Sequence, residues 1–289
     1  MRYAVFLATL CCWLCPALSS AALFVEAPAE ASQGSAVLIR LSSDEAAREA
    51  VIHWQETKFS VPMTADRGMY GGLALVPVPL DAAQPLTLRA AAGKSSVSVE
   101  IRPLKVAWPR QEIQGVEKKY VSPPPEVLKR IENEQRKVRA VLARISPERW
   151  WEMPCVRPAP GDVSSVFGGE RVFNGQPRSR HRGADLRAET GQPIVAMAGG
   201  RVALAEEQYF SGKVVFIDHG LGLVSLYAHL SALRVAEGDT VRAGQLIGLA
   251  GATGRVTGPH LHWGVNILGK AVDPISLLST RSDSSDRTR

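Results

Sequence analysis

Short β-branched or alternating runs, separated by Gly, Pro and Asp, fill two long stretches of the chain and leave little room for helices. In residues 22–105, typical runs are "SAVLIRLSS", "AVIHWQETKFSV" and "SSVSVEIRPL". Strands this short, at this spacing, predict a small antiparallel β-sandwich of the immunoglobulin-like type. Residues 151–278 are richer in Gly, and "GKVVFIDHGLGLVSLYAHL" is typical of consecutive antiparallel strands with tight turns. The sequence therefore predicts a mainly β protein with two β-rich domains.

A different pattern connects the two stretches, in residues 106–150. After "VSPPP", apolar residues recur at roughly helical spacing at Val127, Ile131, Val138, Val141, Leu142 and Ile145, which predicts a helical connection. The segment holds ten Lys and Arg against six Glu, so it carries most of the chain's net charge of +6. A solvated helix face is the simplest meaning of this charge, although an anionic polymer would also be attracted. Whether this segment or the front domain inhibits a groove in the second domain stays open.

The N-terminal "MRYAVFLATLCCWLCPALSSAALF" has the layout of a secretory signal peptide. Arg2 comes first, an apolar run extends through Leu14, and the small residues Ser19 and Ala21 follow. The apolar run is too short for a comfortable membrane span. We therefore expect residues 1–21 to be a signal peptide, which places the protein in the periplasm or cell envelope without a stable membrane span once it is cleaved. Whether it is cleaved stays open.

Three of the four cysteines lie in this segment, so the exported chain would keep only Cys155 and form no internal disulfide. Cys155 is interpreted as a small buried apolar residue. Residues 279–289 lack apolar content and are predicted to be a disordered tail. A chain that is 45% hydrophobic and 21% charged can bury two cores. No Walker-type glycine loop or RNA-binding signature occurs, so a nucleic-acid partner is not expected. The oligomeric state stays open.

Five of the six histidines fall in residues 151–278, and their spacing suggests a metal site. In "HRGADL", His181 and Asp185 are four residues apart, so they share a face in either a strand or a helix. In "GPHLHW", His260 and His262 are two apart and share a face of a strand. His181, Asp185 and one of the later pair would give the three protein ligands of a catalytic zinc site, with one position left for water.

The remaining histidines then need roles. Water activated by a metal needs a base to take its proton, and the attacked carbonyl needs donors for the oxyanion that forms on it. His229, in "SLYAHLS", and the other member of the "HLH" pair are the candidates. His219, in "IDHGLG", is interpreted as structural because its turn setting offers ordinary hydrogen-bond partners.

Taken in order, "HRGADL", "YAHL" and "TGRVTGPHLHW" resemble the lysostaphin/LytM-type zinc metallopeptidases. The resemblance covers about Ser164 to Pro274 and includes "SVFGGERVFNG" and "VRAGQLIGLAGATG". It implies an antiparallel sheet with a groove walled by loops, and cleavage of peptide bonds in bacterial peptidoglycan. Carried over residue by residue, it implies one Zn²⁺ ion held by His181, Asp185 and His262, with His229 and His260 as the catalytic histidines. The chain departs from the family's pattern at Val256, where relatives often carry Ser, and at Gly264, where an acidic residue is common.

The resulting hypothesis is an exported zinc metalloendopeptidase, a hydrolase that acts on peptidoglycan peptides and prefers D-alanyl cross-links to glycine bridges. How His229 and His260 divide the catalytic work stays open. The alternative is a non-catalytic cell-wall-binding regulator of amidases, because some relatives have lost the metal site and act in that way. A third possibility is a structural β protein whose histidines are satisfied in its core. All five positions of the site pattern are present here, which favours the enzyme.

Overall fold

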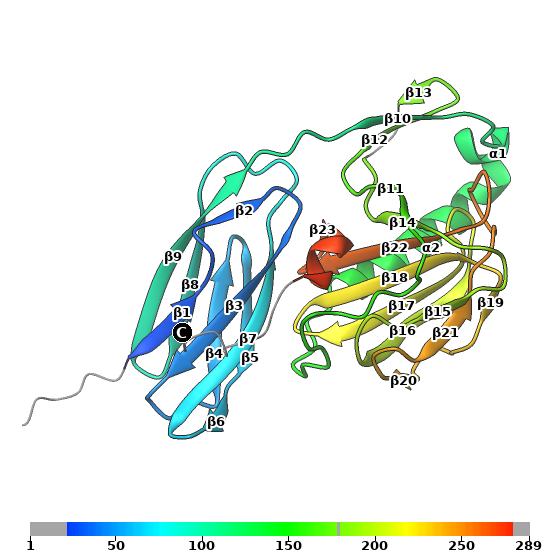
Figure 1. Cartoon of the computed structure of the whole chain (residues 1–289). Coiled ribbons are helices and arrows are strands. Elements are labelled where there is room, and N and C mark those ends of the chain that lie inside the picture. The colour runs from blue at the N-terminus through cyan, green and yellow to red at the C-terminus, as the bar shows by residue number, and fades with distance from the viewer. Residues whose placement is uncertain (1–21, 178–179, 280–289) are drawn as a thin grey trace, which may run out of the picture.

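The structure of the protein is a computed structural model that describes residues 22–177 and 180–279. The segments predicted to be a signal peptide (1–21) and most of a disordered tail (279–289) lie outside the described residues. Two β-rich parts lie side by side and are joined by a long extended segment (Figure 1). The mainly β character predicted from the sequence is confirmed. In the described part of the chain, no helix is long and apolar enough to cross a membrane.

The front part consists of two sheets. One has the strand order β1 (Leu23–Glu26), β3 (Ala36–Ser43), β7 (Met69–Pro77) and β6 (Thr64–Asp66), and the other β2 (Glu30–Ser32), β9 (Ser95–Leu104), β8 (Leu86–Ala92), β4 (Glu49–Trp54) and β5 (Thr57–Pro62). Along β3 buried and half-buried residues alternate, as expected of a strand with one face on a core. Ile39, Ile52 and Leu88 are fully buried between the sheets. The immunoglobulin-like type of this fold stays a prediction.

The connecting segment contains β10 (Arg110–Ile113), α1 (Lys118–Val121) and α2 (Pro125–Leu142). The predicted helix is thus present, and Pro125 occupies its first turn, where a missing N–H costs nothing. Its apolar stripe ends with the helix, and Ile145 lies beyond it and is exposed. Val141 packs in a small apolar cluster with Leu204 and Phe216 of the rear sheet.

The rear part is built on one large sheet. Its strand order is β11 (Val163–Ser165), β14 (Ala184–Arg187), β22 (His260–Ile267), β18 (Leu223–Leu230), β17 (Gly212–Gly220), β16 (Gly200–Gln208) and β20 (Thr240–Val241), with β23 (Lys270–Val272) also paired to β22. Smaller sheets join β15 (Pro193–Val195), β21 (Leu246–Leu249) and β19 (Ala232–Leu233), and join β10, β12 (Glu170–Phe173) and β13 (Gln176–Pro177); a 3-10 helix, η1, covers Pro274–Leu278. Among the described strands, pairing is antiparallel except for β2 with β9 and β10 with β12.

The two faces of the large sheet have different surroundings. On β22, Leu261, Trp263, Val265 and Ile267 are fully buried in the main core. The alternate residues, beginning with His260 and His262, point to the opposite face, because successive side chains of a strand alternate. This second face also carries the cluster on which α2 packs.

The front and rear parts are in contact. The amide of Asp273 donates to the carbonyl of Gly34 (2.7 Å), and the amide of Ala36 donates to Ser276 Oγ (3.3 Å). The Trp108 ring meets Phe167 edge-on, with ring centroids 5.8 Å apart. A Cβ on Gly34 would lie 2.7 Å from the Phe167 ring, so the close approach at this contact requires glycine. These contacts join the front part, and the start of the connecting segment at Trp108, to the rear part.

His219 lies in the core and takes the structural role predicted for it. Its Nδ1–H donates to the carbonyl of Gly199 (2.5 Å), and its Nε2 lies 2.7 Å from Ser225 Oγ, which is 3.0 Å from the Tyr227 hydroxyl. Burial lowers the pKa of His219 to about 4, so the folded protein holds this ring neutral. Cys155 is also buried, as predicted, and burial raises the pKa of its thiol to about 12.

The buried His219 should make stability depend on acid. The unfolded chain binds a proton near pH 6.5 and the folded chain only near pH 4, so stability is lost as the pH falls through this range. The shift corresponds to about 3 kcal/mol. We expect His219→Gln to be less stable than the unmutated protein at pH 7. The difference in their free energies of unfolding should narrow by about 3 kcal/mol between pH 7 and pH 4. Urea unfolding at several pH values measures it. His53→Gln, at an exposed position, is the control, and a gap independent of pH would contradict the prediction.

Candidate metal and catalytic site

The register of three neighbouring strands brings the candidate ligands together. Asp185 of β14 lies opposite His262 of β22, which lies opposite Ala228 of β18 on its other side. Leu186 next to Asp185 is fully buried in the core, so the Asp185 carboxylate points to the same face as His260 and His262. The predicted convergence of one carboxylate with the "HLH" pair is therefore present.

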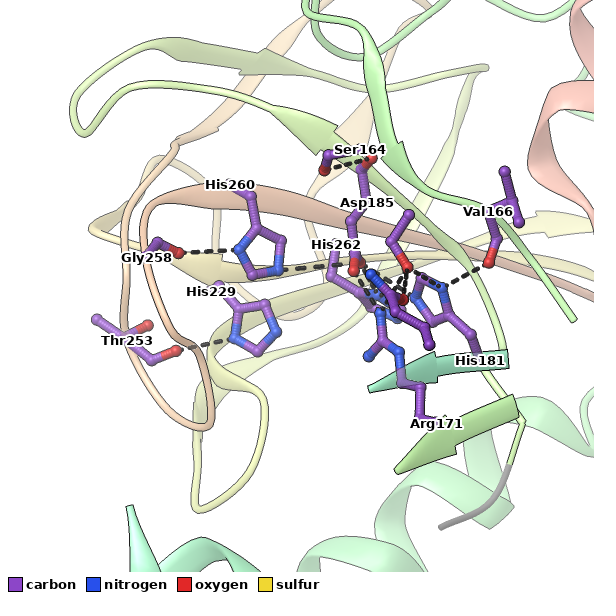
Figure 2. A network of polar contacts seen from close by, with 12 residues as sticks. Ser164, Val166, Arg171, His181, Asp185, His229, Thr253, Gly258, His260 and His262 are labelled. Carbon is purple, nitrogen blue, oxygen red and sulfur yellow. Dashed lines mark hydrogen bonds and ion pairs between the residues drawn. The ribbon is translucent and has the colours of Figure 1, made fainter. Parts of the chain in front are cut away.

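His181 comes from the segment just before β14 and is held by its backbone. Its amide donates to the carbonyl of Gly169 and its carbonyl accepts from the amide of Gly168, both at 2.8 Å. Its Nδ1–H donates to the carbonyl of Val166 (2.9 Å), which leaves Nε2 as the nitrogen that faces Asp185 and His262. Figure 2 shows the ring between Val166 and the Asp185 carboxylate.

The donor atoms form a compact triangle. His181 Nε2 lies 3.1 Å from Asp185 Oδ1 and 3.0 Å from His262 Nδ1, and His262 Nδ1 lies 2.8 Å from Asp185 Oδ1. Ligands bound at zinc's usual bond lengths in a tetrahedron are about 3.3 Å apart. Two imidazoles and one carboxylate, nearly at this separation and almost buried, fit a divalent ion of the zinc type.

Gly183 lets the strands approach closely enough to form the triangle. A Cβ at this position would lie 2.5 Å from the Trp263 carbonyl oxygen and 2.8 Å from His262 Cε1. Such contacts would push the His262 ring away from Asp185. The glycine in "HRGADL" is therefore required by close approach to a ligand.

Three further residues support the triangle from outside. Asp185 Oδ2 accepts a hydrogen bond from the Arg171 guanidinium of β12. Ser165 Oγ lies 3.2 Å from both Arg171 Nη2 and His181 Nδ1, and donates to Gln111 Oε1 at 2.8 Å. Burial alone would raise the pKa of Asp185, but its hydrogen bonds and charge interactions with His181 and His262 hold that pKa well below its usual range. The carboxylate is thus ionised and ready to act as a ligand.

A β-bulge positions His229. Between Val215 and Lys213 of β17, the partner strand β18 advances from Tyr227 to Leu230, which is one residue too many. His229 is the extra residue, and its φ is +66°, a backbone conformation that few residues other than glycine adopt. The bulge turns His229 into the groove, whereas Tyr227, two residues earlier, points into the core.

His229 and His260 share one hydrogen-bonding arrangement. The Nδ1–H of His229 donates to the carbonyl of Thr253 (2.8 Å), and that of His260 to the carbonyl of Gly258 (2.9 Å). Their rings lie 4.9 Å apart, centroid to centroid, and His260 Nε2 is 3.9 Å from Asp185 Oδ1 (Figure 2). In the neutral ring, Nε2 is then the nitrogen without a proton. Burial, with the neighbouring histidines, lowers the pKa of His229 to about 3, and burial lowers that of His262 to about 4 against the opposing effect of Asp185.

A cavity of about 460 Å³ opens over these groups. Asp185, His229 and His260 line it, and residues 255–260 border it. Residues 111–114 and 116 of the connecting segment form another wall, where β10 pairs with β12. Of the predicted connection, it is therefore the extended part that reaches the groove, whereas α2 packs on β16 and gives the cavity no lining residue among those described.

All five residues selected from the sequence are brought to one place. Sequence reasoning missed Gln111, Ser165 and Arg171, and the only available signal was that the last two lie in the "SVFGGERVFNG" stretch. Of the departures from the family's pattern, Val256 lines the cavity beside Thr257. At Gly264 a Cβ would lie 2.9 Å from Leu226, so a larger residue would displace that side chain.

Known proteins resemble this chain in sequence and in fold. The model of Peptidase family M23 matches residues 179–274, which include all five histidine and aspartate positions. A crystal structure from Pseudomonas aeruginosa that is assigned to peptidase M23 is 30% identical, with a TM-score of 0.67, and the match covers 86% of this chain and 94% of that one. The chain belongs to peptidase family M23.

Curated relatives match somewhat more than a third of the chain. The DD-carboxypeptidase/endopeptidase Mpg of Neisseria meningitidis serogroup B is 45% identical over 97 residues, 34% of this chain and 22% of the relative. The peptidoglycan DD-endopeptidase ShyA of Vibrio cholerae is 38% identical over 112 residues, 38% of this chain and 26% of the relative. The match thus spans about a quarter of the length of these relatives.

The predicted split between ligands and catalytic histidines can be tested by metal binding. We expect His181→Ala, Asp185→Ala and His262→Ala to weaken zinc binding by more than the roughly 10- to 100-fold that the loss of an outer-shell partner costs. Ser165→Ala should fall within that smaller range, because Ser165 only supports His181 and Arg171.

Competition with a chromophoric chelator measures the zinc affinity. His229→Ala and His260→Ala are the matched controls and should bind zinc as the unmutated protein does. Loss of zinc from either control, or its retention in Asp185→Ala, would contradict the assignment.

Proposed function

We propose that this protein is an exported zinc metalloendopeptidase that hydrolyses peptide cross-links in peptidoglycan. The observation that carries the proposal is the meeting of His181 Nε2, Asp185 Oδ1 and His262 Nδ1 within 4.8 Å of one another, beside two histidines and next to a cavity that Asp185 lines. Membership of the M23 peptidase family supports peptide hydrolysis as the reaction.

His181, Asp185 and His262 would hold the zinc ion. When bound, zinc supplies Lewis-acid polarisation of the scissile carbonyl and makes water more acidic. Arg171 keeps the Asp185 carboxylate in place through its second oxygen, and the Val166 carbonyl fixes the tautomer of His181. These partners orient the ligands before substrate arrives.

His229 and His260 move the protons. Each has its Nδ1–H fixed on a backbone carbonyl, so its Nε2 can accept a proton from the attacking water and return it to the leaving amine. Once protonated, the same nitrogen can donate to an oxyanion. The two rings lie 4.9 Å apart, close enough to serve one reacting centre from two directions.

The names of the matched relatives support the choice of substrate. Mpg is named a DD-carboxypeptidase/endopeptidase and ShyA a peptidoglycan DD-endopeptidase, which favours D-alanyl cross-links over glycine bridges for this chain. The export signal predicted in residues 1–21 supports a location in the periplasm or cell envelope, where such cross-links occur. A regulator without enzymatic activity would not need a complete ligand set with both histidines oriented.

Digestion of purified peptidoglycan tests the proposal. We expect the zinc-loaded protein to convert D-alanyl cross-linked muropeptide dimers to monomers, identified by mass spectrometry. His229→Ala and His260→Ala should lower kcat by about 10²- to 10⁴-fold, the usual contribution of general acid–base catalysis. Both variants should keep their zinc. Full activity of His260→Ala would overturn its role, and release of glycine-bridge fragments alone would overturn the choice of bond.

A further inference from the structure

Arg187 stands beside the catalytic groups on the same strand face as a metal ligand. It follows Asp185 by two residues on β14, so both side chains point to the groove, about 7 Å apart along the strand. Across the ladder, Arg187 lies opposite His260. Its side chain is exposed and lines the cavity. β14 thus presents a ligand and, one step further along the same face, a cation.

Three arginines line this cavity, and two of them are engaged elsewhere. Arg171 pairs with Asp185 and contacts Ser165. Arg255 lies between two aromatic rings, with its guanidinium carbon 4.9 Å from the Phe173 ring centre and 4.7 Å from that of Phe210. Arg187 differs from both, because its guanidinium has no ion pair or side-chain hydrogen bond among the residues that the structure describes.

The acidic groups of the cavity do not balance Arg187. Asp185 is paired with Arg171, and Glu112, the other carboxylate in the lining, lies 3.5 Å from Arg110. A guanidinium presents several N–H donors in a planar fork that matches a carboxylate. An unpaired fork inside a substrate cavity, beside a catalytic histidine, is suited to an anionic group on the substrate.

We propose that Arg187 binds a carboxylate borne by the residue whose amine is released, and that the enzyme selects substrates in this way. The inference rests on the proposed function, because it places the scissile amide between the metal ligands and the two catalytic histidines. His260 is one of the two groups that can return a proton to the leaving amine, and Arg187 is its neighbour across the strands. A carboxylate on the carbon next to that amine therefore comes within reach of the guanidinium. A terminal residue carries such a carboxylate, and so does the residue that contributes its amine to a direct cross-link.

Two matched substrates test this selection. One is a cross-linked peptide with a free carboxylate next to the scissile amide, and the other is the same peptide with that carboxylate amidated. We expect the unmutated enzyme to prefer the free carboxylate by about 10- to 100-fold in kcat/KM, mainly through KM, as for a charge-assisted hydrogen-bonded pair. Arg187→Ala should lose the preference, and Arg187→Lys should keep part of it because the charge remains.

Arg182→Ala is the matched control. It removes an equal charge next to His181, but Arg182 does not line this cavity, so the preference should persist. Zinc content and the urea unfolding midpoint show whether each variant is folded. A preference that survives in Arg187→Ala, or equal cleavage of both substrates by the unmutated enzyme, would overturn the role of Arg187.

A binding measurement separates this inference from the proposed function. The released amine product, with its carboxylate either free or amidated, is titrated into the zinc-loaded protein by calorimetry. Tighter binding of the free carboxylate, lost in Arg187→Ala, supports the site even if neither peptide is cleaved, in which case only the proposed function fails. Equal binding of both products would overturn the Arg187 site independently of activity.

Discussion

The site depends on the register between β14 and β22. Asp185 meets His262 because the two strands pair with these residues directly opposite each other. A slip of one residue would turn one of the two side chains into the core. The register is fixed from the other face of the sheet, where Leu186, Leu261 and Trp263 are fully buried. Hydrophobic alternation on the core face thus specifies the geometry of polar groups on the groove face.

Backbone carbonyls orient most of the histidine rings of the site. His181, His229 and His260 each use Nδ1–H on a carbonyl, those of Val166, Thr253 and Gly258, and so expose Nε2. His262 is the exception, since its Nδ1 faces Asp185. The carbonyls come from loops, whereas Asp185, His260 and His262 come from strands. The strands therefore fix where these residues lie, and the loop carbonyls fix which ring nitrogen carries the proton. This arrangement suits a site whose ligands must be oriented in advance.

The sequence predicted the β architecture and the helical connection, because strand alternation and apolar spacing are local signals. The five site positions were chosen from histidine spacing together with the resemblance to the metallopeptidase family. The structure brings them together, and their roles stay a prediction. The sequence did not predict the bulge that turns His229 into the groove, since a regular strand would place His229 on the same face as the buried Tyr227. Nor did it reveal Gln111 or Arg171. Gln111 reaches Ser165 from 54 positions away, and such a contact produces no recognisable pattern among the sequence neighbours of either residue. Pairing of β10 with β12 is equally non-local, and β10 lies in the connecting segment, where the sequence predicted a Pro-rich stretch and a helix and no strand.

The pairing of β10 with β12 also covers a strand edge. β12 has β13 on one side and β10 on the other, so removing residues before α1 would leave an open strand edge beside the groove. Exposed edges of this kind pair readily with other extended chains. A fragment that contains only the rear part would therefore expose an unpaired, association-prone strand edge next to its own cavity. Rate constants measured on such a fragment would describe self-association and an altered mouth as well as hydrolysis, so the intact chain is the proper object for kinetics.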